Sequence, residues 1–219
     1  MKHLVIIDPA MQRAEFECFN EISKRAPMPV TYHLPGLYGT ASLESETLSE
    51  VAGIMVLGSA ASVLSPLSWQ SSLKEWLRSA FSANLPVLGI CYGHQLIASM
   101  FGAEVGFVSP SHDKLTGLRR ISLQPGNHPW SGTVSTSGDV VISHREEVKN
   151  CPSDFYVLAS SPNIAIDGLA HKSKPIYSFQ FHPEATEAFL QNQGIVISAE
   201  RFPAYGLKLV EAFLKVLSH

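Results

Sequence analysis

The sequence predicts an α/β fold: a doubly wound, mostly parallel sheet with helices on both faces, plus a smaller antiparallel region. Up to Gly102, short unbroken apolar runs of strand length alternate with longer amphipathic segments of helical period. After Gly102 the apolar residues occur instead in short alternating runs, separated by turn signals such as the Gln-Pro-Gly-Asn of residues 124–127. No repeat or linker interrupts the chain, so we expect one domain spanning residues 1–219.

The first half of the chain is expected to alternate strand and helix. Apolar runs predict buried parallel strands at residues 3–7, 52–57 and 86–90, and a further strand is expected at residues 30–34. Helices are expected from Asp8-Pro9 through about Arg25, in a short polar stretch to about Glu50, from Pro66 to Phe81, and after Cys91. The first helix would use Phe16, Phe19 and Ile22 on its apolar face, and residues 35–40 would form a loop. Apolar spacing on the third helix marks Trp69, Leu73, Trp76, Leu77 and Phe81.

The second half is expected to be rich in antiparallel strands. Gly102 is placed to cap the preceding helix, and residues 104–170 should form hairpins. A further strand is predicted from Ile176 to Phe181 and a helix from about Thr186. A closing helix from Pro203 to Leu217 would carry one apolar side, made of Leu207, Val210, Phe213, Leu214 and Leu217.

Composition excludes several classes of protein. The 219 residues are 45% apolar and 16% charged, with a formal net charge of −3, which is typical of a globular chain with a full core. No Lys/Arg block, long apolar run or signal-peptide core is present, so nucleic acid and membrane are poor expectations for partners. Three irregularly spaced cysteines favour a reducing compartment, the cytoplasm.

Cys91 is the first candidate functional residue, because it lies where a buried strand passes into a helix. Gly89 and Gly93 flank it in a Gly-x-Cys-x-Gly pattern, the cysteine counterpart of the Gly-x-Ser-x-Gly elbow that pushes a nucleophile out of a sheet. The helix N-terminus should favour the thiolate and lower the pKa of Cys91. From the pentapeptide alone, a structural cysteine in a βα unit remains the alternative.

His182 and Glu184 form the second candidate group. Two positions apart on an extended segment, their side chains would point the same way, so the carboxylate could orient one imidazole nitrogen and leave the other for a nucleophile. A lone His-Pro-Glu is usually a loop. Following a predicted buried strand in a chain with a cysteine elbow, it predicts Cys91 as nucleophile, His182 as base and then acid, and Glu184 as orienting group.

Two segments together resemble the class I glutamine amidotransferase family: GICYGHQLIA at residues 89–98 and FQFHPEA at residues 179–185. In that family Gly-x-Cys-x-Gly-x-Gln and a later Phe-His-Pro-Glu carry the glutaminase triad, and both motifs match here at every diagnostic position. The likeness extends over essentially the whole chain and implies that family's flavodoxin-like fold. It is greatest to the stand-alone, GMP synthase-like members.

The resemblance implies roles for further residues. Backbone N–H groups of Gly58 and Tyr92 would form the oxyanion hole, and Gln95 would help to hold the substrate. The segment Ser143-His144-Arg145, with Glu146 to Val148 after it, resembles the family's Ser-His-x-Asp-x-Val, whose backbone lines the pocket for the substrate's α-amino and α-carboxylate groups. His144 could equally serve only to support this loop.

Two departures from the family pattern stand out. The GMP synthase branch usually has Gly-Gly-Pro-x-Ser in its oxyanion loop, whereas residues 58–62 are Gly-Ser-Ala-Ala-Ser, so this loop could withhold Gly58 until a substrate or partner binds. Glu146 replaces an Asp, which could alter contacts with a partner domain.

The other candidate groups favour no additional chemistry. We expect His94 to be structural, Cys18 to be a packed or partly exposed thiol, and Cys151 to be a bystander. The remaining histidines stand singly, with no Cys/His cluster, so neither a metal site nor a cofactor is expected. Gly36 to Gly39 lacks the Lys-Ser/Thr of a phosphate loop.

Three functions remain open at this point. The preferred one is hydrolysis of L-glutamine with ammonia delivered to an acceptor on a separate synthetase partner, because the chain ends directly after its closing helix. The second is a γ-glutamyl hydrolase acting on a γ-glutamyl peptide or amine by the same thioester chemistry. The third is a non-catalytic regulatory subunit with the same fold.

Overall fold

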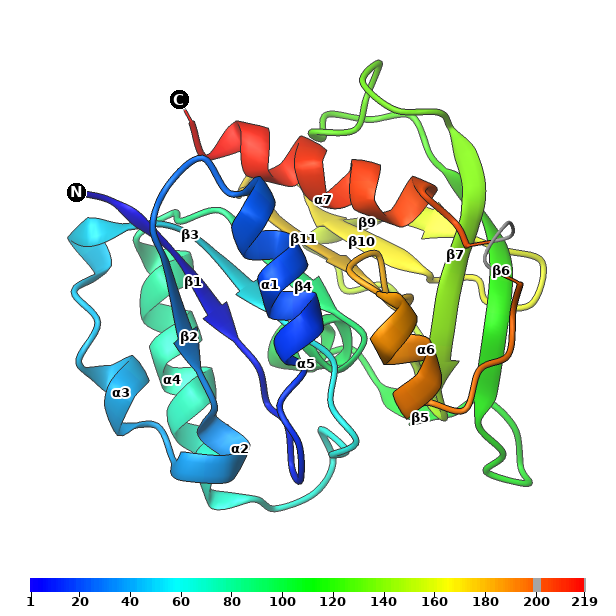
Figure 1. Ribbon diagram of the computed structural model, residues 1–219, viewed down its shortest axis with the longest axis horizontal. Coiled ribbons are helices and arrows are strands. Elements are labelled where there is room, and N and C mark those ends of the chain that lie inside the picture. The colour runs from blue at the N-terminus through cyan, green and yellow to red at the C-terminus, as the bar shows by residue number, and fades with distance from the viewer. Residues whose placement is uncertain (199–201, 219) are drawn as a thin grey trace.

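Strands that are apolar on both sides need helices over both sheet faces, and the parallel half of this protein is built in that way. The computed structural model describes residues 1–198 and 202–218. Its centre is a nine-stranded sheet of order β2-β1-β3-β4-β11-β10-β9-β6-β7 (Figure 1). The five parallel strands, in spatial order, are β2 (Val30–His33), β1 (His3–Ile7), β3 (Val51–Val56), β4 (Val87–Ile90) and β11 (Ile176–Phe179).

The other half of the sheet is antiparallel and continues directly from β11. Its strands are β10 (Gly168–His171), β9 (Phe155–Ser160), β6 (Leu115–Leu123) and β7 (Ser137–His144). A separate two-stranded sheet pairs β5 (Val105–Phe107) with β8 (Glu146–Val148). The predicted fold class is therefore confirmed, and the antiparallel strands extend the parallel sheet.

Helices cover the two faces of the parallel half, with α1 and α7 on one side and α4 and α5 on the other (Figure 1). The helical segments are α1 (Phe16–Arg25), α2 (Pro35–Tyr38), α3 (Ala41–Glu44), η1 (Leu48–Glu50), α4 (Ser68–Ser82), α5 (Tyr92–Met100), α6 (Glu187–Asn192) and α7 (Tyr205–Val216). Alternate residues along each strand enter opposite cores: Val5 and Ile7 pack with α4 and α5, whereas Leu4 and Ile6 pack with α1 and α7. The expected apolar face of α4 is buried throughout.

The N-terminal segment differs from the prediction. The first helix begins at Phe16 and not at Asp8, because the Asp8 carboxylate accepts backbone N–H groups of Ala10 (3.0 Å) and Glu15 (2.9 Å) and so organises a loop. Phe16 is 57% exposed, and Cys18 takes its place on the buried face of α1 beside Ile22.

Smaller corrections concern three other segments. The expected loop at residues 35–40 contains the short helix α2. Strand β11 ends at Phe179, two residues earlier than predicted, although His182 still forms an isolated bridge to Val141 of β7. On α7 it is Leu209 that is fully buried, while Leu207 is half-buried. Within the described residues, no helix is both long and apolar enough to cross a bilayer.

The α7 core contact yields a stability prediction. Phe213 is fully buried against the sheet, so Phe213→Ala should lower the free energy of unfolding by about 3–5 kcal/mol through lost burial and a residual cavity. Phe16→Ala, the same chemical change at a largely exposed site, should cost less than about 1 kcal/mol. Urea denaturation of both variants measures the difference. Equal losses would contradict this account of the core.

Candidate active site

The site is built around a strained turn between β4 and α5. Cys91 has φ 50° and ψ −97°, a backbone conformation that residues with a side chain rarely adopt. Its N–H still bonds to Phe179 O at 2.8 Å, so the pairing of β4 with β11 continues up to the turn. The sharp elbow predicted for Cys91 is confirmed.

Close backbone approach explains the glycines on either side of the cysteine. A Cβ atom at Gly93 would overlap the carbonyl oxygen of Val56 on β3. A Cβ atom at Gly89 would lie 2.6 Å from Gly93 O. The first turn of α5 can therefore pack directly on the sheet only when both positions lack a side chain.

The Cys91 side chain is almost completely buried. The residue is 4% exposed, so the elbow lifts the thiol out of the strand without opening it to solvent. Its Sγ is 3.9 Å from Ser143 O, and Gln180 Nε2 approaches Sγ to 3.7 Å. The antiparallel half of the sheet, which supplies Ser143, thus covers the nucleophile candidate.

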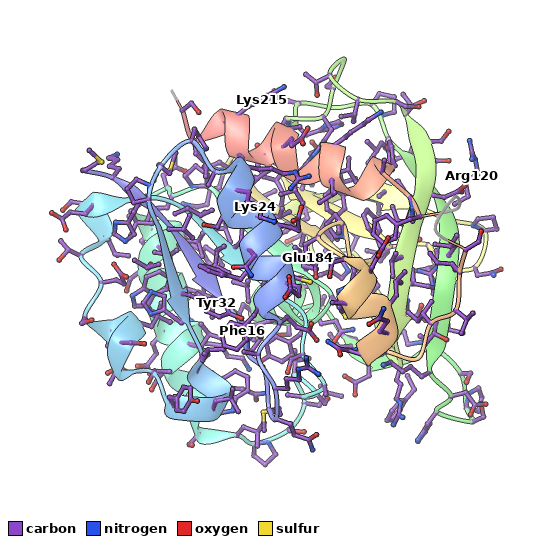
Figure 2. All side chains as sticks on the ribbon, in the orientation of Figure 1. Phe16, Lys24, Tyr32, Arg120, Glu184 and Lys215 are labelled. Atoms are coloured by element: carbon purple, nitrogen blue, oxygen red, sulfur yellow. The ribbon has the colours of Figure 1, made fainter. Side chains whose placement is uncertain are left out.

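His182 and Glu184 make the contact that their spacing predicts. His182 Nδ1 bonds to Glu184 Oε1 at 2.9 Å, and both residues are at most 5% exposed. Residues 183 and 184 form a turn and not the extended segment we predicted, and the backbone N–H of His182 donates to Val141 O at 2.8 Å. In the view of Figure 2, Glu184 lies near the centre of the molecule between α1 and α6.

Cys91 and His182 face each other across Gly58. A Cβ atom at Gly58 would lie 2.6 Å from His182 Cε1 and 3.5 Å from Cys91 Cβ, so the two side chains converge on one glycine. Burial alone would lower the pKa of His182, but Glu184 and then Cys91 outweigh it and raise that pKa above its usual value.

The loop that carries Gly58 is fixed by its side chains. Ser59 Oγ donates to Pro9 O at 2.6 Å and accepts from Ala61 N at 3.0 Å. Ser62 Oγ donates to the Glu146 carboxylate at 2.8 Å. The loop is therefore bonded, through the serine that it shares with the family pattern, to residue 146, where the chain departs from that pattern.

Tyr92 opens α5, where first-turn backbone N–H groups have no intrahelical acceptor. Its ring is buried against Trp69, with the ring centroids 5.8 Å apart, so the side chain serves packing. Gln95 is 4% exposed, and its Nε2 donates to Glu146 O at 2.8 Å and to Gln180 Oε1 at 3.2 Å. In this state the Gln95 amide holds the segment that follows β7.

Ser143 and His144 end β7 beside the thiol, and Arg145 follows the strand. Ser143 and His144 are buried, and Arg145 is exposed. His144 Nδ1 donates to Glu146 O at 3.0 Å, because its Nε2, 2.9 Å from an Arg119 guanidinium nitrogen, must be the acceptor. The structure thus brings Cys91, His182, Glu184, Gly58 and Ser143 together.

Comparison with known proteins places this arrangement in a family. The family model described as glutamine amidotransferase class-I matches residues 32–194, which is more than half of the chain. The chain belongs to the class I glutamine amidotransferase family.

Curated relatives point to one branch of the class I amidotransferases. A subunit of the glutamine-hydrolysing GMP synthase of Methanocaldococcus jannaschii is 35% identical over 150 residues, covering 68% of this chain and 73% of the relative. The corresponding subunit of Thermoplasma acidophilum is 34% identical over 142 residues, covering 65% and 68%. The glutamine-hydrolysing GMP synthase of Eremothecium gossypii is 38% identical over 111 residues, which is only 20% of that protein.

Solved structures of amidotransferases share the fold. A glutamine amidotransferase from Thermotoga maritima superposes with a TM-score of 0.76 at 16% identity, covering 99% of this chain and 96% of that one. One from Methylobacillus flagellatus gives a TM-score of 0.67 at 17% identity, covering 99% and 92%. At such low identity these likenesses concern the fold alone.

Sequence reasoning missed a buried ion pair behind the pocket wall of this amidotransferase. Arg119 donates to Asp167 Oδ1 at 2.6 Å and also reaches His144, as above. Asp167 is fully buried, and burial raises its pKa although Arg119 opposes the shift. One signal was available: Arg119 has the same parity on β6 as the buried Ile121 and Leu123, so a basic side chain points inward.

Sequence reasoning also missed two carboxylates that interact electrostatically with Glu184, those of Asp8 and Glu15. Burial raises the pKa of Asp8, and Glu184 adds to that shift. The pKa of Glu15 is shifted in the same direction, by burial first and by Asp8 next. Tyr32 donates its hydroxyl to Asp8, which offsets part of the cost. Among the described residues there is no cluster of three or more His, Cys, Asp or Glu that could hold a metal ion.

His94 is structural, as expected, and gives this amidotransferase a testable pH dependence. It is fully buried on α5 with its Nδ1 2.8 Å from Ser178 Oγ, and burial lowers its pKa to about 3. Below a pH of about 6.5 His94 is protonated in the unfolded chain but stays neutral in the folded protein. The free energy of unfolding therefore decreases as the pH is lowered, by up to about 1.4 kcal/mol per pH unit.

His94→Asn removes this titration. Urea unfolding between about pH 6 and pH 4.5 should give a shallower loss of stability in the variant than in the wild type, by roughly that slope. The comparison uses slopes, so a constant destabilisation by the substitution does not affect it. Parallel pH profiles would show that His94 does not stay neutral in the folded state.

Proposed function

We propose that this amidotransferase hydrolyses the side-chain amide of L-glutamine through a γ-glutamyl thioester on Cys91 and passes the ammonia to an acceptor on a separate synthetase protein. One observation carries the proposal: the thiol on a strained elbow and the His182 imidazole converge on Gly58, and the imidazole is bonded through Nδ1 to a buried carboxylate. This is the order of groups that nucleophilic amide cleavage requires.

His182 is the proton carrier of the proposed mechanism. With Nδ1–H donated to Glu184 and its pKa raised, His182 takes the Cys91 proton at Nε2 before Sγ attacks the amide carbon of glutamine. The imidazolium then protonates the leaving nitrogen, the C–N bond breaks, and ammonia departs from the thioester. Water, deprotonated by the same nitrogen, hydrolyses the C–S bond to give glutamate and the free thiol. Glu184 keeps the ring in the tautomer and orientation that both steps need.

The negative oxygen of each tetrahedral intermediate needs donors that are in place beforehand. We assign this role to the backbone N–H groups of Gly58, which lies against both side chains, and of Tyr92, which begins α5. By analogy with other oxyanion holes, each donor contributes about 3 kcal/mol. The hydrogen bonds from Ser59 to Pro9 O and from Ser62 to Glu146 support this assignment, because they restrict the movement of the loop that contains Gly58.

The substrate's α-amino and α-carboxylate groups would bind along the wall formed by Ser143, His144 and Arg145. Gln95 supports that wall by donating a hydrogen bond to Glu146 O. Its side chain would contact the substrate while it holds this bond. The buried Arg119 and the His144 ring keep the wall in place. No cofactor takes part in the proposed reaction.

The partner is inferred from the relatives. Two of them are named as one subunit of a glutamine-hydrolysing GMP synthase, which supports a synthetase on another chain as the ammonia acceptor. The three cysteines of this chain are free thiols, which fits the cytoplasm as the proposed compartment.

Cys91→Ser tests the chemistry. The purified wild-type protein should release glutamate from glutamine, and the variant should lose at least about 1,000-fold in rate because its nucleophile is gone. Cys151→Ser, the same change at a thiol outside the site, should retain full activity. Equal activity in wild type and Cys91→Ser would refute the mechanism. A wild-type Cys91 that a glutamine-like electrophile fails to label, even with the synthetase present, would favour a non-catalytic role.

A γ-glutamyl hydrolase is the second candidate, favoured by the altered loop at residues 58–62 and its bond to Glu146. A panel of γ-glutamyl peptides and amines, compared with glutamine by kcat/KM, separates the two. We expect glutamine to be preferred by about tenfold or more, because ammonia is the smallest leaving group and the thiol is 4% exposed. A higher kcat/KM for a γ-glutamyl peptide than for glutamine would show that the protein is a γ-glutamyl hydrolase.

A further inference from the structure

Three polar side chains from distant parts of the chain meet beside the thiol. Gln193, which follows α6, accepts two hydrogen bonds at its Oε1: from Lys114 Nζ at 2.6 Å and from Ser143 Oγ at 2.9 Å. The carbonyl of the same Ser143 is 3.9 Å from Cys91 Sγ. The Gln193 amide oxygen thus accepts hydrogen bonds from an ammonium and a hydroxyl group close to Cys91, the candidate nucleophile.

The pairing of β6 with β7 fixes where Lys114 lies. Leu115 pairs with His144 and Thr116 with Ser143, so Lys114 comes opposite Arg145 at the end of the hairpin. Both residues therefore lie at the open end of the β6–β7 hairpin, and both are exposed. Burial lowers the pKa of Lys114, whereas Cys91 opposes that shift, consistent with a cation near the thiol.

The donor pair is better matched to a carboxylate than to the amide it now holds. An ammonium and a hydroxyl that converge on one oxygen offer a charge-assisted hydrogen bond, which is about twice as strong to an ionised acceptor as to a neutral one. Glutamine carries such a carboxylate at its α-carbon, at the opposite end from the amide that Cys91 would attack.

We propose that Lys114 and Ser143 form the binding subsite for the substrate's α-carboxylate, and that Gln193 Oε1 occupies this subsite in the free enzyme. The proposal rests on the function proposed above and adds a residue outside the matched motifs, Lys114. Substrate entry replaces a neutral oxygen by a charged one, so ligands with a carboxylate displace Gln193 and ligands without one do not.

Two thiol reagents separate recognition of a carboxylate from reactivity of the thiol. The first, 6-diazo-5-oxo-L-norleucine, is shaped like glutamine and keeps the α-carboxylate; the second, iodoacetamide, has none. Both are used on the full-length protein, with the rate of Cys91 modification followed by mass spectrometry. In Lys114→Met, labelling by the norleucine reagent should slow about tenfold, while labelling by iodoacetamide should change less than about twofold.

Three further variants complete the test. Lys114→Arg keeps the charge and should recover most of the norleucine rate. Gln193→Ala frees both donors and should accelerate that reagent by about twofold to fivefold. Arg120→Met removes a charge from the outer side of the same strand, where Figure 2 shows its side chain at the edge of the molecule, and should change neither rate.

The outcomes are distinct. Equal slowing by both reagents in Lys114→Met would mean that Lys114 acts on the thiol, and no slowing would mean that it does not bind substrate; either result overturns the proposal. Slower labelling of Gln193→Ala would make Gln193 a substrate ligand and overturn its role as a displaceable occupant. If the norleucine reagent fails to label even the wild type, it is the proposed amidotransferase function that fails.

Discussion

The elbow at Cys91 is the constraint on which the rest of the site depends. Its positive φ costs about 1–3 kcal/mol, and it persists because the structure holds both sides of it. On one side, β4 pairs with β11 up to the bond from Cys91 N to Phe179 O. On the other, α5 is packed so closely on β3 that Gly93 has no room for a side chain. Because β11 also leads into His182, one strand pair sets the positions of both thiol and imidazole.

The antiparallel half of the sheet completes the site through a continuous set of hydrogen bonds. Asp167, immediately before β10, accepts from Arg119, which also reaches His144. His144 and Gln95 both donate to Glu146 O. Buried polar groups of this kind are costly unless each finds a partner, so the network favours one position of the wall over the thiol. The strands added to the parallel sheet are therefore a structural part of the site.

Local patterns made much of this predictable. The elbow and the contact between His182 and Glu184 depend on neighbouring residues, so a short stretch of sequence predicted both, although residues 183 and 184 form a turn and not the predicted extended segment. The predicted start of α1 was wrong because Asp8 resembles a helix start, while its carboxylate organises a loop in contact with Tyr32 on β2. The Arg119–Asp167 and Lys114–Gln193 contacts join residues 48 and 79 positions apart, and only the folded tertiary structure brings them together.

The two departures from the family pattern lie in segments that contact each other through Ser62, a serine that the family pattern keeps. A loop that loses a glycine and a proline changes its backbone freedom in the unfolded chain, and the folded loop needs other restraints. Ser59 supplies one by bonding to Pro9 O, and Ser62 supplies another by bonding to Glu146. Since Gln95 and His144 hold Glu146 by its backbone, the loop bearing Gly58 is joined to the opposite wall of the site. A change at either Ser62 or Glu146 would thus act on both walls together.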